Sequence, residues 1–292
     1  MHDKAVDRAF RVVPSLNETV TKTVYSSKLR LIFIVGLEGT GHHYFAAVLN
    51  HLCETSHVSC PTTCEMGMAL YPGLGNPKTA NDYRTARESL RREMKRLAAA
   101  ADELEDGMAA MASFGMCRYV GMMSYPNFDG AGKALQYVDF RILVEEAELA
   151  GVDLRLVYLS RPAQDIVIAD TKHRHYGDTF ILETRSLVAN ADVMANTFRE
   201  LGSGFTTCFF YDEMSSSKQA ERVATFLAPT QYAEESLMQR MLRAVKLRST
   251  GEKASIYDKY PDITDPESGE GLLVARLQQK LDAIEEEHCR GF

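Results

Sequence analysis

The chain has 292 residues, of which 45% are hydrophobic and 25% are charged, with 19 glycines and 9 prolines. These proportions are ordinary for a globular protein and exclude disorder, collagen and low-complexity sequence. Lys and Arg number 33 against 40 Asp and Glu, so the net charge is −7 and nucleic acid is not expected as the main partner. The longest apolar run, residues 31–37 broken only by Gly36, is too short to cross a bilayer, and we expect no transmembrane helix.

Four short segments rich in β-branched or aromatic residues are predicted to be strands: 29–35, 118–123, 154–159 and 205–211. Helical spacing of apolar residues predicts helices over 81–111, 132–149, 186–201, 218–227, 234–247 and 272–288. Strands separated by helices predict an α/β fold, with a parallel sheet flanked by helices and further helical additions. We expect one domain over residues 1–292, with 1–28 as an N-terminal extension and 265–292 as a C-terminal helix.

A glycine-rich turn follows the first predicted strand and leads into a helix. Its residues 36–43 read GLEGTGHH, in which Gly36 and Gly41 have the G-x4-G spacing of phosphate-binding loops. Three glycines let successive N–H groups point inward, and the helix N-terminus adds partial positive charge, so the pattern predicts a phosphate site. His42 and His43 replace the Lys and Ser or Thr of nucleotide-hydrolysing loops, which weakens the case for ATP hydrolysis. The alternative is a tight turn whose glycines serve helix–sheet packing.

Three segments, in this order, resemble the sulfotransferases that use 3'-phosphoadenosine 5'-phosphosulfate (PAPS). The first is the loop 36–43, and the second is 154–167, LRLVYLSRPAQDIV, similar to the family's strand ending in Arg before a Pro-containing helix start. The third is 208–214, CFFYDEM, followed by the helix 221–227, similar to a late strand with a Tyr-acid-acid-aliphatic motif. The resemblance implies a sheet of the P-loop NTPase-like type, PAPS as the donor, and chemistry that requires no metal.

On this resemblance the loop cradles the 5'-phosphosulfate and Arg161 binds the 3'-phosphate. Arg161 also follows the carboxyl end of a predicted strand, the edge where parallel sheets bind ligands, although a surface pairing with Asp165 is the alternative. Relatives close the pocket with a late basic loop, for which the segment around Arg248 and Lys253 is our candidate; a solvated helix end is the alternative. The predicted donor site comprises Gly36, Gly39, Thr40, Gly41, His42, Arg161, Thr171, Arg248 and Lys253.

Three positions depart from the family's pattern. Gly39 stands where relatives carry Lys or Arg, Ala169 where they place a Ser, and Ser124 where cytosolic relatives have their catalytic His. Thr171 and Lys172 are near enough in sequence to replace Ala169, but a shift of two residues along a helix turns a side chain well away. The sequence therefore leaves the catalytic base open.

Sulfuryl transfer needs a base for the acceptor and donors that hold the charge on the sulfuryl group. His43 and Glu38 are both placed to face a substrate, whereas His42, at the Lys-equivalent position, suits phosphate contact better. Relatives of the Golgi type use a carboxylate, which favours Glu38, but nearby anionic groups repel an ionised carboxylate. We favour His43 as the base, with Glu38 and His42 as the other catalytic candidates and Asp129 as an outsider.

On this resemblance, we expect an enzyme that moves a sulfuryl group from PAPS to a hydroxyl or amine of a carbohydrate, protein or small molecule. The alternatives are a P-loop nucleoside or nucleotide kinase or NTPase, which needs Mg²⁺, and a non-catalytic sulfotransferase-like binding protein. The first residues lack a secretory signal, so we expect the cytoplasm, or the Golgi lumen if the chain is a fragment of a longer precursor. The oligomeric state stays open.

Six cysteines permit disulfides without requiring them. One group of possible soft ligands is close in sequence, namely Cys53, His57, Cys60 and Cys64, and a disulfide, free thiols or a zinc ion are its three interpretations. The other cysteines are dispersed at Cys117, Cys208 and Cys289. The acidic run 285–287 is expected to be a solvated helix face.

Overall fold

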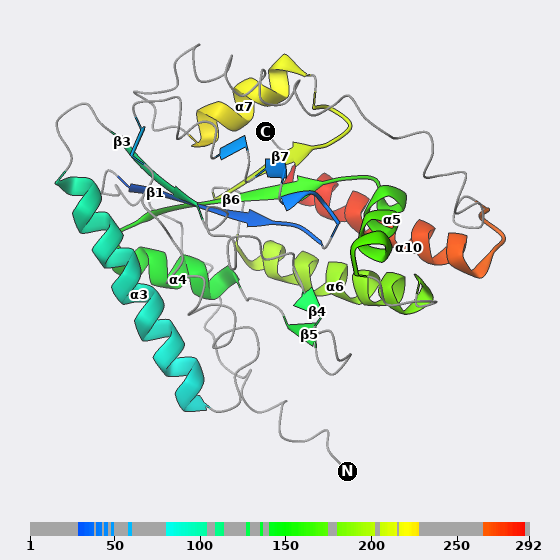
Figure 1. Ribbon diagram of the computed structural model, residues 1–292, viewed down its shortest axis with the longest axis horizontal. Coiled ribbons are helices and arrows are strands. Elements are labelled where there is room, and N and C mark those ends of the chain that lie inside the picture. The colour runs from blue at the N-terminus through cyan, green and yellow to red at the C-terminus, as the bar shows by residue number, and fades with distance from the viewer. Residues whose placement is uncertain are drawn as a thin grey trace.

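The computed structural model describes residues 29–37, 39–42, 44–45, 48–49, 58–59, 80–103, 109–113, 127–128, 135–136, 140–174, 180–201, 205–214, 216–227 and 265–289. A five-stranded parallel sheet forms its centre (Figure 1). The strands are β1 (Leu29–Val35), β2 (Val58–Ser59), β3 (Ala109–Ser113), β6 (Asp153–Ser160) and β7 (Thr206–Phe210), in the order β2-β3-β1-β6-β7. A separate antiparallel pair joins β4 (Asn127–Phe128) to β5 (Leu135–Gln136).

Helices cover both faces of the sheet. They are α3 (Ala80–Asp102), α4 (Phe140–Ala150), α5 (Ala163–Arg174), α6 (Phe180–Leu201), α7 (Ser217–Leu227) and α10 (Gly269–His288). In Figure 1, α3, α4 and α6 lie below the sheet and α7 lies above it. None of the helices that the structure describes combines the length and the apolar character needed to span a bilayer.

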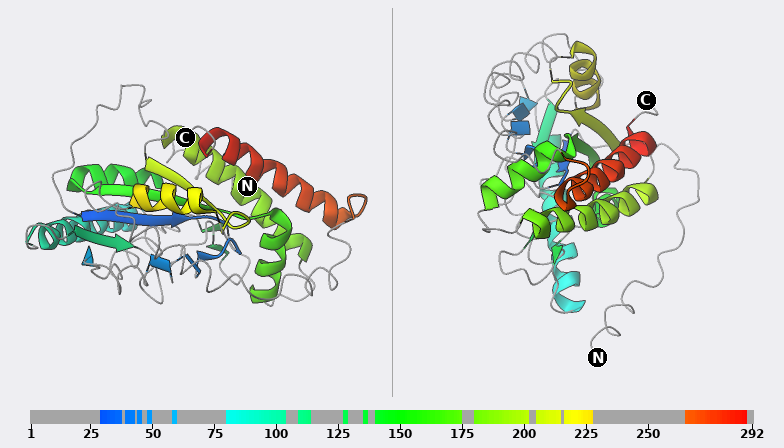
Figure 2. Two further views of the ribbon diagram at one scale, coloured as in Figure 1. Left: turned by 90° about the horizontal axis from the view of Figure 1, so that it is seen from above. Right: turned by 90° about the vertical axis from the view of Figure 1, so that its right-hand side faces the viewer.

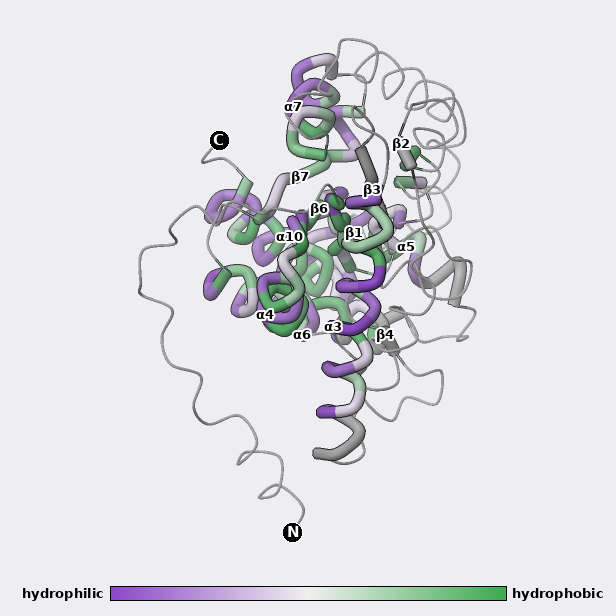
Figure 3. The backbone as a smooth tube through the Cα atoms, turned by 90° about the vertical axis from the view of Figure 1, so that its left-hand side faces the viewer, coloured by the Kyte–Doolittle hydropathy of each residue, from purple (hydrophilic) through white to green (hydrophobic). Residues whose placement is uncertain are grey.

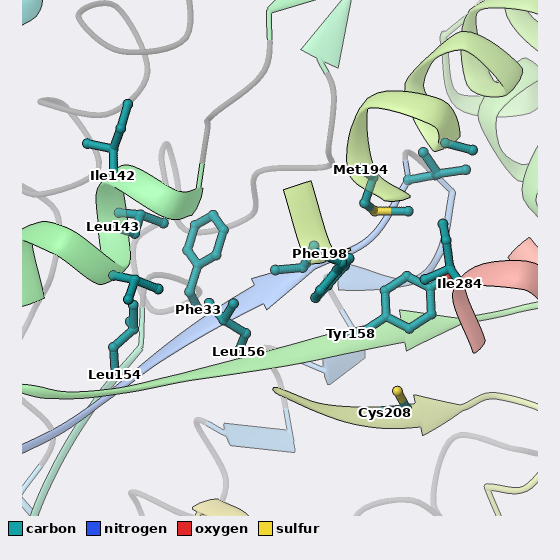
Figure 4. Packing of buried hydrophobic residues seen from close by; sticks show 14 of the residues in the cluster. Phe33, Ile142, Leu143, Leu154, Leu156, Tyr158, Met194, Phe198, Cys208 and Ile284 are labelled. Carbon is teal, nitrogen blue, oxygen red and sulfur yellow. The ribbon is translucent and has the colours of Figure 1, made fainter. Parts of the chain in front are cut away.

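The two faces are built by alternation along the strands. Phe33 points to the face covered by α3, α4, α6 and α10, whereas Ile32 and Ile34 pack with α7 and with Phe45 on the other face. The larger core joins β1 and β6 to three helices through Phe33, Leu156, Tyr158, Leu143, Phe198 and Ile284 (Figure 4). Each large apolar side chain buried in this way contributes about 1.5–3 kcal/mol. Along α3, hydrophilic stretches alternate with paler or hydrophobic ones, as expected of a helix with one buried face (Figure 3).

The predicted fold class, α/β with a parallel sheet flanked by helices, is confirmed. Three predicted strands are present as β1, β6 and β7, each within one residue of the predicted bounds. The predicted helices at 186–201, 218–227 and 272–288 are present as α6, α7 and α10, with α6 beginning six residues earlier. The segments 118–123 and 234–247 lie outside the described residues.

Two predicted helices were too long. The predicted helix 81–111 ends at Asp102, and Ala109–Ser113 instead forms β3, which pairs with β1. Alanine and methionine favour helices, but hydrogen bonding to the central strand overrides this weak local preference. The predicted helix 132–149 begins only at Phe140, because Leu135–Gln136 pairs with β4.

The strand order places a ligand-binding crevice at a definite point. The chain leaves β1 towards β2 on one side of the sheet, and it leaves β6 towards β7 on the other side. In open parallel sheets, ligands bind outside the carboxyl ends of two neighbouring strands whose connections diverge in this way. The crevice is therefore expected between the carboxyl ends of β1 and β6.

Helix α10 runs alongside α6 (Figure 2). A disulfide joins Cys289, just after α10, to Cys208 in β7, with 5.6 Å between the two Cα atoms. The acidic run 285–287 is not simply a solvated face as expected, because Glu285 accepts a hydrogen bond from the hydroxyl of Ser160 at the end of β6. Its neighbour Glu287 is exposed and pairs with Arg199 of α6.

Candidate functional site

The loop after β1 turns over two glycines with left-handed backbone, Gly39 at φ 84° and Gly41 at φ 94°. Between them, Thr40 is only 1% exposed. Its N–H and its hydroxyl both donate to the carbonyl oxygen of Leu37, at 3.1 and 2.7 Å. Thr40 therefore stabilises the conformation of the loop. A contact from its side chain to PAPS stays a prediction.

Packing around the loop also requires glycine. A Cβ on Gly39 would lie 2.5 Å from the carbonyl oxygen of Ile166 in α5, and a Cβ on Gly41 would overlap the hydroxyl of Tyr211. A Cβ on Gly36 would overlap the hydroxyl of Thr40. Packing of the loop against itself, α5 and Tyr211 therefore suffices to explain the glycine pattern, and evidence for a phosphate must come from the groups around the loop.

Arg161 is the first residue after β6, at the expected crevice. Its Nη1 donates to the carbonyl oxygen of Gly39 at 3.0 Å, and its Nε lies 3.6 Å from Oδ2 of Asp165 in the first turn of α5. The guanidinium thus contacts the loop and pairs with Asp165 at the same time, with 26% of the side chain exposed. No described residue accepts a hydrogen bond from its Nη2, so that end of the guanidinium keeps its donors for another acceptor.

Tyr211, the first residue after β7, also contacts the loop. Its hydroxyl donates to the carbonyl oxygen of Gly41 at 2.6 Å, and its ring packs edge-on against Tyr44 with 5.6 Å between centroids. The guanidinium carbon of Arg161 lies 5.9 Å from the centre of the same ring. Burial and the neighbouring Tyr44 raise the pKa of Tyr211, with Arg161 opposing the change, so the phenol remains a protonated donor.

Tyr211 lies in the motif 208–214 but was not among the site residues predicted from the sequence. The missed signal is its position, because it directly follows a strand at the edge where Arg161 also lies. The contact from Tyr211 to Gly41 joins residues 170 positions apart, which no local spacing predicts.

The site offers several hydrogen-bond donors to an anion. No described group accepts a hydrogen bond from the N–H of Gly39 or of Gly41. The helix after the loop begins here, with the N–H groups of Tyr44 and Phe45 bonded to the carbonyl oxygen of Gly41 at 3.0 and 3.1 Å. Backbone N–H groups, a helix start and a partly exposed guanidinium together suit a phosphate or sulfate group.

His42 is 3% exposed, and its Nδ1 lies 3.3 Å from the hydroxyl oxygen of Thr40. In this arrangement the imidazole has no exposed edge from which to reach an acceptor. The catalytic role predicted for His42 stays a prediction.

Other predicted site residues lie outside the described part of the chain: Glu38, His43, Ser124, Asp129, Arg248 and Lys253. Thr171 belongs to α5, but its side chain and that of Lys172 are not among those described. Ala169 is a half-buried residue of the same helix. The group Cys53, His57, Cys60 and Cys64, like Cys117, is also outside the described residues.

Comparisons with known proteins find few similarities. No family model matches the sequence. No curated protein matches it either. Among solved structures, the fold is similar to the sulfotransferase domain of the olefin synthase of Synechococcus PCC 7002, with a TM-score of 0.45 and 14% sequence identity. The match covers 87% of this chain and 94% of that domain, and at this distance it identifies neither a donor nor an acceptor.

Proposed function

We propose that this protein is a sulfotransferase that moves a sulfuryl group from PAPS to a hydroxyl or amine acceptor. One observation carries the proposal: the three sequence segments that resemble this family meet around a single loop. Arg161 of the second segment donates to Gly39, and Tyr211 of the third donates to Gly41. The carboxyl ends of the adjacent parallel strands β1, β6 and β7 form the edge at which open α/β sheets bind their ligands.

The donor groups at the site fit PAPS, which carries a phosphosulfate and a separate 3'-phosphate. The N–H groups of Gly39 and Gly41, with the helix start behind them, would hold the phosphosulfate. Arg161, through Nη2, would hold the 3'-phosphate. PAPS supplies the sulfuryl group, which leaves its phosphate as the acceptor attacks.

The chain itself must remove the acceptor's proton and neutralise charge during transfer. Gly39 provides no cation at its position, so the charge that develops on the sulfuryl oxygens falls to the backbone N–H groups of the loop. For the base we propose His43, with Glu38 as the alternative, because both border the loop and His42 is buried. No step here requires a metal ion.

A thermal shift assay tests the proposal. Adenosine 3',5'-bisphosphate, the product that remains after transfer, should raise the melting temperature of the protein in the presence of EDTA. A ligand that binds only the folded state stabilises that state. Mg-ATP should give no comparable shift. Stabilisation by Mg-ATP alone would favour the kinase or NTPase alternative, and no shift with either compound would contradict nucleotide chemistry at this site.

The disulfide between Cys208 and Cys289 is informative about the cellular compartment of the protein. Cys208 and Cys289 are both buried and bonded, and such bridges persist in oxidising compartments. This supports an oxidising compartment such as the Golgi lumen over the cytoplasm. Mass spectrometry of the alkylated, non-reduced protein isolated from its cells tests this, since free thiols at both positions would contradict it.

A further inference from the structure

Helix α10 contacts the turn that carries Arg161 on both sides. Glu285 accepts a hydrogen bond from the hydroxyl of Ser160, the last residue of β6. Gln278, through Oε1, accepts from the N–H of Ala163, the first residue of α5, at 2.8 Å. These two contacts bracket Arg161.

The contact from Gln278 satisfies a group that α5 cannot satisfy itself. The first N–H groups of an α-helix have no partner within the helix, and α5 makes its first internal bond from Ile166 to Pro162. Gln278 lies 115 residues further along the chain than Ala163. Its Nε2 donates to Oδ1 of Asp282 at 2.8 Å, which turns the amide so that its oxygen faces the start of α5.

Helix α10 is itself fixed in place. The ion pair of Lys280 with Asp192 joins it to α6 near its middle, whereas the exposed pair of Glu287 with Arg199 contributes little. The disulfide from Cys289 then ties its carboxyl end to β7, three residues before Tyr211. One helix thus holds both strands whose carboxyl ends carry the loop contacts.

We propose that α10 positions Arg161, with Glu285 and Gln278 as positioning residues that hold the turn 160–163. Each acts through a residue beside the arginine, Glu285 through the hydroxyl of Ser160 and Gln278 through the N–H of Ala163. The proposal rests on the proposed function, because it assumes that Arg161 binds the 3'-phosphate. It goes further by assigning part of the donor affinity to a helix at the far end of the sequence.

The test compares matched substitutions on α10. Glu285→Ala removes the acceptor for Ser160, Glu285→Gln keeps an acceptor oxygen, and Glu287→Ala is the same truncation two residues away on an exposed ion pair. We expect Glu285→Ala to weaken binding of adenosine 3',5'-bisphosphate about three- to tenfold by calorimetry, and Glu285→Gln and Glu287→Ala to bind as the wild type does.

A second measurement does not depend on the nucleotide. Amide hydrogen exchange, followed by mass spectrometry on the peptide covering 161–167, should become about three- to tenfold faster in Glu285→Ala and in Gln278→Ala. It should stay unchanged in Glu285→Gln and Glu287→Ala. Ser160→Ala removes the same hydrogen bond without altering α10, so it should reproduce Glu285→Ala, and the double variant should lose no more than either single one.

The outcomes separate the two proposals. Equal effects of Glu285→Ala and Glu287→Ala on exchange, or no effect of either, would overturn the positioning role. If the wild type does not bind the bisphosphate, the proposed function fails, while the exchange data still decide whether α10 holds the turn. If Glu285→Ala does not fold, Ser160→Ala provides the same comparison.

Discussion

Arginines lie at both ends of strand β6, and their surroundings differ: Arg155 and, from the neighbouring β1, Arg30 lie at its amino end, and Arg161 follows its carboxyl end. At the amino end, Arg30 and Arg155 both donate to the carboxylate of Asp153, each at 2.8 Å. Arg30 also donates to the carbonyl oxygen of Phe226, and the guanidinium of Arg155 lies 5.0 Å from the centre of the Phe226 ring. At the carboxyl end, Arg161 has one carbonyl at 3.0 Å and one carboxylate at 3.6 Å.

This difference distinguishes arginines that stabilise the fold from an arginine that is available to bind a ligand. Burial lowers the pKa of Arg30, with Asp153 opposing the shift, so this cation is held inside the fold by its carboxylate. Arg161 is more exposed and stands beside a loop whose own N–H groups are directed to no described acceptor. A cation whose donors are satisfied within the chain contributes to folding, whereas one left with donors beside a glycine loop is available to an anion.

The largest expected effect is on turnover at the carboxyl edge. If the imidazole of His43 removes the acceptor's proton, His43→Ala should lower the rate of sulfuryl transfer by about two to four orders of magnitude with little change in donor binding. Glu38→Gln is the parallel variant, because the amide keeps the shape and removes the basicity. A radiolabelled transfer assay with saturating PAPS identifies the base as the residue whose loss stops turnover; full turnover in both variants would remove both from the mechanism.

The next effect is on donor affinity. Arg161→Met should weaken binding of adenosine 3',5'-bisphosphate by about 2–4 kcal/mol, because a charge-assisted pair with the 3'-phosphate is lost. Arg155→Met, at the other end of the same strand, is the matched control and should bind the nucleotide as the wild type does. Calorimetry on both variants checks this, and equal affinities for the two would erase the distinction between the ends of β6.

The third effect is on the stability of the fold, and it concerns the arginines at the amino end of β6. Arg30→Met should lower the free energy of unfolding by about 1–3 kcal/mol, because Asp153 is left half-paired with only Arg155 beside it. Nucleotide affinity should not change. Urea unfolding measures the first quantity and calorimetry the second, and a stable variant with reduced affinity would contradict the structural role of this edge.

Local sequence predicts three strands of the sheet, β1, β6 and β7, and the glycine turn after β1, because their signals are local. The apolar run from Leu29 to Val35 ends at a glycine, and the structure places β1 over these same residues. The helical spacing of apolar residues did not predict α5; only the resemblance to a Pro-containing helix start indicated it, and α5 does begin directly after Pro162.

What the sequence missed depends on partners far along the chain. The strand at Ala109–Ser113 is defined by its pairing with β1, not by its own helix-favouring residues. Cys208 and Cys289 are 81 residues apart, and no spacing rule connects them. The contact from Glu285 to Ser160 was missed for the same reason, because an acidic run at a chain's end is usually solvated.

A smaller effect is expected from the hydroxyl that links β7 to the loop. Tyr211→Phe keeps the ring against Tyr44 and removes the hydrogen bond to Gly41, so donor affinity should fall by about 1 kcal/mol, or about fivefold. The same loss without any change in the free energy of unfolding would mean that the hydroxyl shapes the site alone. Calorimetry and urea unfolding on one preparation give both values, and unchanged affinity would reduce Tyr211 to a packing residue.

The smallest effect is expected in alkaline solution, again at Tyr211. Its pKa is raised by burial and by Tyr44, while an unfolded tyrosine ionises near pH 10, so above about pH 10 the unfolded state releases its proton first. The stability from this group is therefore complete below about pH 10 and decreases as the pH rises further. Tyr211→Phe removes this decrease, so its urea midpoint should fall less than that of the wild type between about pH 10 and pH 11. Tyr158, whose pKa is also raised by burial, is present in both proteins and cancels in the comparison. Equal slopes would mean that the Tyr211 phenol ionises as freely in the folded chain as in the unfolded one, which would contradict its burial beside the loop.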